Sequence, residues 1–249
     1  MRSLLPIMLG LVILSGCASG PHRTHVDVLA DVRRPPADRT RDPPRHPLEV
    51  LAFAGVKPGQ KIGEYMPGAG YFTRILAVAV GPGGVIYANQ PREIVRLQPS
   101  YLSDIQAVAS AYDTVRIAST ATADFGAPEP LDLVITVQNY HDFHTRFASA
   151  GTSQAFNAAV IAALKPGGRY VIIDHSALAG TGISAADPLH RIDPATVKAE
   201  VLAAGFVLEA QSTVLANPAD ARTASVFAPE IRGATDQFAL RFRKPVPGR

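Results

Sequence analysis

The sequence predicts one α/β domain built around a mostly parallel, seven-stranded sheet. Short segments rich in apolar and β-branched residues alternate with segments of helical periodicity between residues 48 and 245. Clusters of Gly and Pro separate many of these segments, as at residues 57–59, 81–84 and 165–168. The chain has 249 residues, 47% of them hydrophobic, which suits one such domain with a sizeable core and short extensions.

Seven segments have the composition of strands. The clearest is residues 131–137, a nearly continuous apolar run typical of a strand buried on both faces. Residues 170–173 are β-branched and aromatic, and they follow the Gly-containing turn at residues 165–168. In chain order the expected strands are residues 61–65, 85–89, 115–118, 131–137, 170–173, 206–215 and 238–242.

Helical segments lie between these strands. Residues 154–164 place large apolar side chains one turn apart, which predicts an amphipathic helix. Asp193 is a preferred N-cap and Pro194 suits a first turn, so another helix is expected to begin there and to end at Gly205. The remaining expected helices are residues 48–54, 71–80 and 93–111, the last interrupted at Pro99.

Parallel sheets of this kind bind ligands beyond the carboxyl ends of their strands, where the strand order reverses. The loops that follow Tyr65, Asn89, Ala118, Val137 and Ile173 are therefore the expected places for a functional site.

The loop after the first strand carries the most informative motif. Residues 64–73 read Glu-Tyr-Met-Pro-Gly-Ala-Gly-Tyr-Phe-Thr, in which Gly68 and Gly70 allow close approach of a ligand and of the next helix. This acidic residue followed by a Gly-rich strand-to-helix turn resembles the first motif of Rossmann-like S-adenosylmethionine-dependent methyltransferases. Residues 164–172, which read Leu-Lys-Pro-Gly-Gly-Arg-Tyr-Val-Ile, and residues 203–206 resemble later segments of the same family.

The resemblance covers roughly residues 48–244 and implies a Rossmann-like fold with an antiparallel final strand, and S-adenosylmethionine as the cofactor. Three departures predict weak or altered cofactor binding. Met66 stands where the family usually has its first Gly, Asn89 and Gln90 replace the acid that bonds the ribose, and Ser119 lies where Asp contacts the adenine. The cofactor-binding residues that the resemblance implies are Glu64, Met66, Pro67, Gly68, Ala69, Gly70, Tyr71, Asn89, Gln90 and Asn139.

A polar cluster follows the fourth strand, where residues 138–144 read Gln-Asn-Tyr-His-Asp-Phe-His. The resemblance places it over the methyl group of the cofactor. His141 is the expected general base, with Asp142 orienting its ring, and Tyr140 or Tyr71 would face the sulfonium cation. The alternative is that Asp142 caps the next helix and that the imidazoles lie on the surface.

An alternative at the same edge is a divalent metal site. Asp174 ends the fifth strand in a manner similar to the carboxylates that hold magnesium in catechol-type O-methyltransferases, so Asp174, Asp142 and Asn139 would form an oxygen-rich set. Carboxylates are common at strand ends, and no metal is therefore expected. Residues 189–193 would either shape the substrate pocket or form an ordinary helix entry.

The first 16 residues have the features of a lipoprotein signal peptide. Arg2 supplies a positive start, and the apolar run at residues 4–14 is too short to span a bilayer. Residues 14–17 resemble the bacterial lipobox, in which Cys17, the single cysteine, would be lipidated. Ala18 resembles an outer-membrane sorting signal, so the expected location is the outer membrane, facing the periplasm. A plain secretory signal is the alternative.

Residues 17–47 are rich in Pro, Arg and Asp and poor in large apolar residues. Such a composition predicts a solvated tether between the lipid and the domain at residues 48–245. The alternative is that its mixed charges fold back over the domain as a lid.

Two functions from different classes remain open. One is a membrane-tethered methyltransferase acting on a small-molecule or lipid-associated acceptor, and the other is a non-catalytic or altered-ligand lipoprotein that keeps the fold. Glu64, Gly68, Gly70 and the polar cluster at residues 139–144 favour the methyltransferase, which is the expected function. The predicted location favours the alternative, since S-adenosylmethionine is made in the cytoplasm. A net charge of +3, the absence of Trp and the lack of a basic stripe argue against nucleic-acid binding. The absence of a Gly-x-Ser-x-Gly elbow argues against a serine hydrolase of that type.

Overall fold

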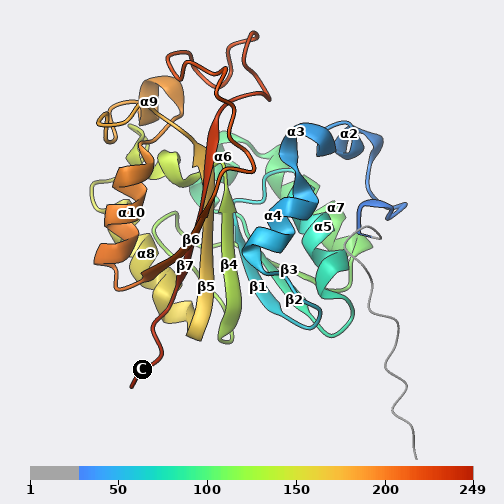
Figure 1. Ribbon diagram of the computed structural model, residues 1–249. Coiled ribbons are helices and arrows are strands. Elements are labelled where there is room, and N and C mark those ends of the chain that lie inside the picture. The colour runs from blue at the N-terminus through green and yellow to red at the C-terminus, as the bar shows by residue number, and fades with distance from the viewer. Residues whose placement is uncertain (1–27, 249) are drawn as a thin grey trace, which may run out of the picture.

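The computed structural model describes residues 28–248, so the expected signal peptide and Cys17 lie outside the described residues. Its centre is a seven-stranded sheet with the strand order β3-β2-β1-β4-β5-β7-β6 (Figure 1). Neighbouring strands are parallel from β3 to β5, and β7 is antiparallel to both of its neighbours, β5 and β6. The strands are β1 (Lys61–Tyr65), β2 (Val85–Asn89), β3 (Val115–Ala118), β4 (Leu131–Val137), β5 (Leu164–His175), β6 (Val207–Ser212) and β7 (Gln237–Arg243).

Helices cover both faces of this sheet (Figure 1). One core cluster joins the sheet to α4 (Pro47–Ala54), α5 (Tyr71–Val80) and α7 (Ser100–Ala111). The other joins it to α8 (Thr152–Ala163) and α10 (Pro194–Ala203). The shorter helices are α2 (Pro36–Arg39), α3 (Asp42–Arg45), α6 (Arg92–Leu97), α9 (Ala186–Leu189) and the 3-10 helix η1 (Tyr140–His144). This arrangement confirms the predicted fold class. Within residues 28–248, no helix has the length and apolar character needed to cross a bilayer.

The sequence-based boundaries agree closely for β1 to β4 and for α5. Asp193 caps α10 as expected, since its carboxylate accepts a hydrogen bond from the Ala195 amide. The turn predicted at residues 165–168 lies within the bounds of β5, but these four residues have no partners in β4, because the register shifts from Leu164 opposite Leu131 to Arg169 opposite Leu133. The shift accommodates Gly and Pro residues that would otherwise interrupt a regular ladder.

The predicted tether is corrected over its described part. Residues 28–47 pack against the domain instead of extending into solvent. Arg34 is only 1% exposed and donates to both carboxylate oxygens of Asp42, while Asp38 accepts from the Arg74 side chain on α5 at 2.7 Å. Asp38 and Asp42, which suggested a solvated linker, are each paired with an arginine, and this pairing offsets their desolvation. Residues 28–47 therefore fold back over the domain, which was the alternative to a solvated tether.

Candidate functional site

A cavity of about 710 Å³ opens at the carboxyl ends of the parallel strands, a volume typical of small-molecule sites. The loop after β1, the residues after β4, α3, α6 and the segment before β7 all contribute to its wall. Of the residues predicted from the sequence, Glu64, Met66, Pro67, Gly68, Ala69, Tyr71, Asn139, His141 and Asp142 line the cavity.

The loop after β1 leaves this cavity open. Met66 has φ +53°, the left-handed conformation that Gly adopts most easily, so the backbone takes a glycine-like path despite the substitution. Asn139 helps to hold it there by donating to the Met66 carbonyl at 3.2 Å. A Cβ added to Gly68 would meet only the Tyr101 ring, at 3.7 Å, and would otherwise lie in open space. The Gly68 face is therefore available to a ligand.

Three predicted cofactor residues do not line the cavity. Gly70 lies where α5 meets α7, and an added Cβ would come within 2.7 Å of Val108, so this glycine serves helix packing. Asn89 is buried and exchanges hydrogen bonds with the Thr120 hydroxyl at 2.9 and 3.0 Å. Gln90 supports the loop by accepting from the Gly68 amide at 3.2 Å. The predicted contact of Asn89 and Gln90 with a ribose is thus corrected, since both side chains are fully buried and neither lines the cavity.

The cavity wall combines a buried carboxylate with guanidinium groups. Glu64 is 4% exposed, and its Oε2 atom has no hydrogen-bond partner among the described residues. Burial raises the pKa of Glu64 to about 7. Arg45 donates to the Gln138 side chain at 2.7 Å and lies 4.6 Å from the centre of the Tyr71 ring, and burial lowers its pKa to about 10. Arg41 lines the same wall. Adjacent charges of both signs suit a zwitterionic ligand group.

His141 is held by a different carboxylate from the one expected. Asp174, at the end of β5, accepts from the His141 amide at 2.7 Å and bonds its Nδ1 at 2.8 Å. The orienting role assigned to Asp142 is therefore corrected, because Asp142 lies on the other side of the ring, with its Oδ1 3.4 Å from Nε2. The sequence signal was the position of Asp174 at a strand end, which brings it to the same edge as the residues after β4.

The surroundings of His141 and Asp174 shift the pKa values of both side chains. Burial alone would lower the pKa of His141, but the charge and hydrogen bond of Asp174 raise it above the ordinary value. Burial would likewise raise the pKa of Asp174, and the opposing influence of His141 lowers it. Burial raises the pKa of Asp142 to about 6. Asp174 therefore stabilises the charged form of His141.

The other aromatic residues of the cluster serve packing. Tyr140 is buried, and its hydroxyl bonds Glu200 and Asn157, so it does not face the cavity. His144 bonds Glu200 at 3.1 Å. Tyr71 lines the cavity, but Arg45 stacks on its ring, which corrects the expectation that its face would meet a sulfonium. Of the two imidazoles, only His141 belongs to the site, and at 3% exposed it is not a surface group.

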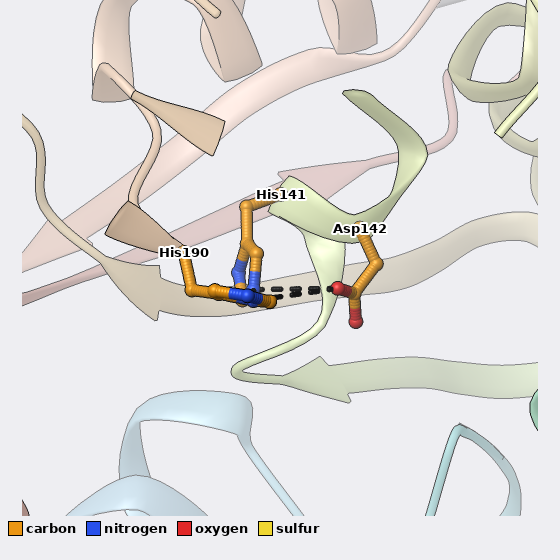
Figure 2. A group of neighbouring side chains, drawn as sticks. All are labelled: His141, Asp142 and His190. Atoms are coloured by element: carbon orange, nitrogen blue, oxygen red, sulfur yellow. Dashed lines mark hydrogen bonds and ion pairs between the residues drawn. The ribbon is translucent and has the colours of Figure 1, made fainter. Parts of the chain in front are cut away.

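The oxygen-rich metal set is not formed. Both carboxylate oxygens of Asp174 are occupied by hydrogen bonds from His141 and His175, and the Asn139 amide donates to backbone carbonyls. Sequence reasoning gave no specific role to His190, which follows α9 and lies with Nδ1 3.2 Å from His141 Nε2. Figure 2 shows His141 and His190 facing the Asp142 carboxylate.

No protein-family model matches the sequence, and neither does any curated protein. Solved structures share its architecture. A SAM dependent methyltransferase from Aquifex aeolicus has a TM-score of 0.59 at 15% identity, covering 89% of this chain and 98% of that one. The glycopeptide N-methyltransferase MtfA complexed with sinefungin has a TM-score of 0.56 at 16% sequence identity, and the match covers 91% of this chain and 100% of that one. The cyclase SpnF has a TM-score of 0.58 at 17% sequence identity, and the match covers 84% of this chain and 81% of that one. The chain therefore has the Rossmann-like fold that these methyltransferases share with a cyclase.

Proposed function

We propose that the chain binds S-adenosylmethionine in this cavity and transfers its methyl group to a small-molecule or lipid-associated acceptor. One observation carries the proposal. The open Gly68 face lies in the same cavity as the partnerless Glu64 carboxylate and the Arg45 guanidinium. An amino-acid group, with its ammonium and carboxylate, is complementary to that pair of charges. The solved structures of this fold with S-adenosylmethionine or sinefungin bound support the same ligand class.

The chain's own residues divide the binding task. Glu64 would accept hydrogen bonds from the ammonium, and Arg45, assisted by Arg41, would bind the carboxylate. Ile94, Leu97 and Tyr101 offer an apolar wall for a flat aromatic base. These three residues come from α6 and α7, whereas Glu64 and the arginines come from β1 and the segment around α3.

When bound, the cofactor supplies an electrophilic methyl group. The protein then has to align an acceptor with that group and, where the acceptor is protonated, remove its proton. We propose that His141 accepts this proton at Nε2, since Asp174 binds the proton on Nδ1 and fixes the ring. Asp174 is a positioning residue in this role.

Calorimetric titration of the full chain in detergent with S-adenosylmethionine, and separately with S-adenosylhomocysteine, tests the proposal. We expect saturable binding of both, and loss of the heat in Gly68→Val, whose side chain would project into the ligand space. Gly59→Val is the matched control, because Gly59 also has a positive φ but has open space around it at the amino end of β1. Binding that survives in Gly68→Val, or no binding at millimolar ligand, would overturn the proposal.

One observation favours the second function, a protein of this fold with an altered ligand. Asn89 stands at the end of β2 and bonds Thr120 inside the protein, so no acidic side chain there faces the cavity. A ligand lacking a ribose diol would not need one. Titration with methionine and with adenosine separates the two functions. Binding of methionine as tight as that of S-adenosylmethionine would favour the altered ligand.

We also propose that Cys17 anchors the chain by lipid to the outer membrane, facing the periplasm. The support is the order of Arg2, the apolar run at residues 4–14 and the Leu-Ser-Gly-Cys sequence that ends at Cys17. Labelling of expressing bacterial cells with radioactive palmitate should mark the wild-type chain but not Cys17→Ser. Equal labelling of both chains would contradict the anchor.

A further inference from the structure

We propose that a divalent transition-metal ion binds between His141 Nε2, His190 Nδ1 and Asp142 Oδ1, at the wall of the cavity (Figure 2). The three residues come from two separate parts of the chain. Residues 141 and 142 lie in η1 after β4, whereas His190 follows α9. All three side chains direct a metal-binding atom to one point.

The spacing of the three atoms matches a metal site. His141 Nε2 lies 3.2 Å from His190 Nδ1 and 3.4 Å from Asp142 Oδ1, and the last two atoms are 4.0 Å apart. The circle through three atoms with these separations has a radius of about 2.1 Å, which is the usual length of a zinc–imidazole or zinc–carboxylate bond. A point at bond distance from all three atoms therefore exists, in the plane that they define.

Among the described residues, no hydrogen-bond donor compensates the burial of the Asp142 carboxylate. It is about one quarter exposed, and among the described residues its oxygens accept no hydrogen bond and form ion pairs only with the two imidazoles. Carboxylates that are largely buried normally have hydrogen-bond donors or a bound ion. A cation at the point where the three side chains meet would supply that missing partner.

Asp174 prepares His141 for this role. In the neutral ring, a proton on Nδ1 donated to Asp174 would leave the Nε2 lone pair on the side of His190 and Asp142. A carboxylate behind a metal-binding histidine is a recurrent feature of metal sites, since it fixes the tautomer and strengthens the ligand. The two carboxylates, Asp142 and Asp174, also balance the charge of one divalent ion.

The donor set points to a zinc-like ion rather than to magnesium. Two imidazoles and one carboxylate suit Zn²⁺, Fe²⁺ or Co²⁺, while Mg²⁺ prefers oxygen ligands. The three ligands also line the cavity, so the remaining coordination positions face the space available to an acceptor. His190 has φ +54°, a conformation that is uncommon for histidine and that directs its ring toward this point.

The consequence for chemistry rests on the proposed function. A metal ion in this position would bind an oxygen of the acceptor and lower the pKa of its hydroxyl group. His141 Nε2 has a single lone pair, so it serves as a base only while the site is free of metal. With metal bound, the ion would hold the acceptor oxygen and lower its pKa, and the hydroxyl proton would pass to solvent water in the open cavity. The favoured acceptors would be those that offer a metal-binding hydroxyl.

The experiment measures metal binding without any methyl donor. The full chain in detergent is stripped with a chelator and titrated with Co²⁺, whose visible absorption reports its coordination, and Zn²⁺ affinity is measured by competition with a chromophoric chelator. We expect one ion per chain, displacement of Co²⁺ by Zn²⁺, and no displacement by millimolar Mg²⁺. His190→Ala and Asp142→Asn should each weaken binding by about 100-fold or more, and Asp174→Asn by about 10- to 100-fold.

The matched control is His144→Ala, which removes another histidine of η1 that bonds Glu200 outside the cavity and should leave affinity unchanged. Circular dichroism confirms that each variant is folded. Absence of Co²⁺ absorption bands in the folded wild-type chain, or equal affinity in wild type, His190→Ala and Asp142→Asn, would overturn the site. S-adenosylmethionine binding is measured separately, so failure of the proposed function leaves this result interpretable.

Discussion

Glu64→Gln tests whether the ionised Glu64 carboxylate in the cavity lowers the free energy of unfolding. Burial raises the pKa of Glu64 from 4.5 to about 7. The native state therefore binds this proton more tightly than the unfolded chain does, so stability falls as pH rises through that interval and stays lower above it. At 1.36 kcal/mol for each unit, ionised Glu64 destabilises the native state by about 3 kcal/mol at pH 8.5.

Gln keeps the shape of the side chain and cannot ionise. Glu64→Gln should raise the free energy of unfolding by about 3 kcal/mol at pH 8.5 and by less than about 1 kcal/mol at pH 4.5. Urea denaturation of both proteins at each pH, followed by circular dichroism, gives the two differences, and other titrating groups cancel in the comparison. Equal differences at the two pH values, or a less stable variant at pH 8.5, would refute the reasoning. The variant should also bind an ammonium-bearing ligand more weakly.

Two further predictions concern the elements around the cavity. Gly70→Ala should lower the free energy of unfolding by about 1–3 kcal/mol in urea denaturation, because its Cβ would lie 2.7 Å from Val108 and its φ is +78°. An unchanged stability would contradict the tight packing of α5 on α7. Asp38→Ala should leave Arg74 buried without its partner, destabilising the chain by about 3 kcal/mol and exposing residues 39–45 to trypsin. Unchanged cleavage rates would show that this ion pair does not hold the segment.

The parts of the fold that local sequence determines were predicted well. The strands β2 and β4 are mostly apolar runs, turn-forming residues precede β1 and β2, and α10 begins at a recognisable cap, Asp193. The extension of β5 through residues 165–168 was missed, because this Pro- and Gly-containing sequence is also typical of a turn. These four residues have no partners in β4 and lie at a shift of register between Leu164 and Arg169, which the local sequence does not distinguish from a turn before the strand.

The packing of residues 28–47 was not predictable from composition. Arg34, Asp38 and Asp42 have the character of solvated residues, and their burial depends on partners in the same segment and in α5. Composition counts charges but does not show which charges meet.

Only part of the site was predictable from the sequence, because some of its residues are brought together from distant parts of the chain. The loop after β1 and the position of His141 follow from the topology of parallel sheets, which brings strand ends together. The partners of His141 lie farther along the chain, since Asp174 is 33 residues away and His190 is 49 residues away. Sequence proximity suggested Asp142 as the orienting group, and the fold replaced it with Asp174.

The central claim is that the hollow beside Gly68 holds an adenosyl amino acid. A crystal structure of the full chain grown with S-adenosylhomocysteine tests it most directly. We expect the ligand to lie in the cavity along the loop at residues 66–69, with its ammonium against Glu64 and its carboxylate against Arg45. A well-ordered structure with the ligand bound elsewhere, or with none bound at saturating concentration, would contradict it.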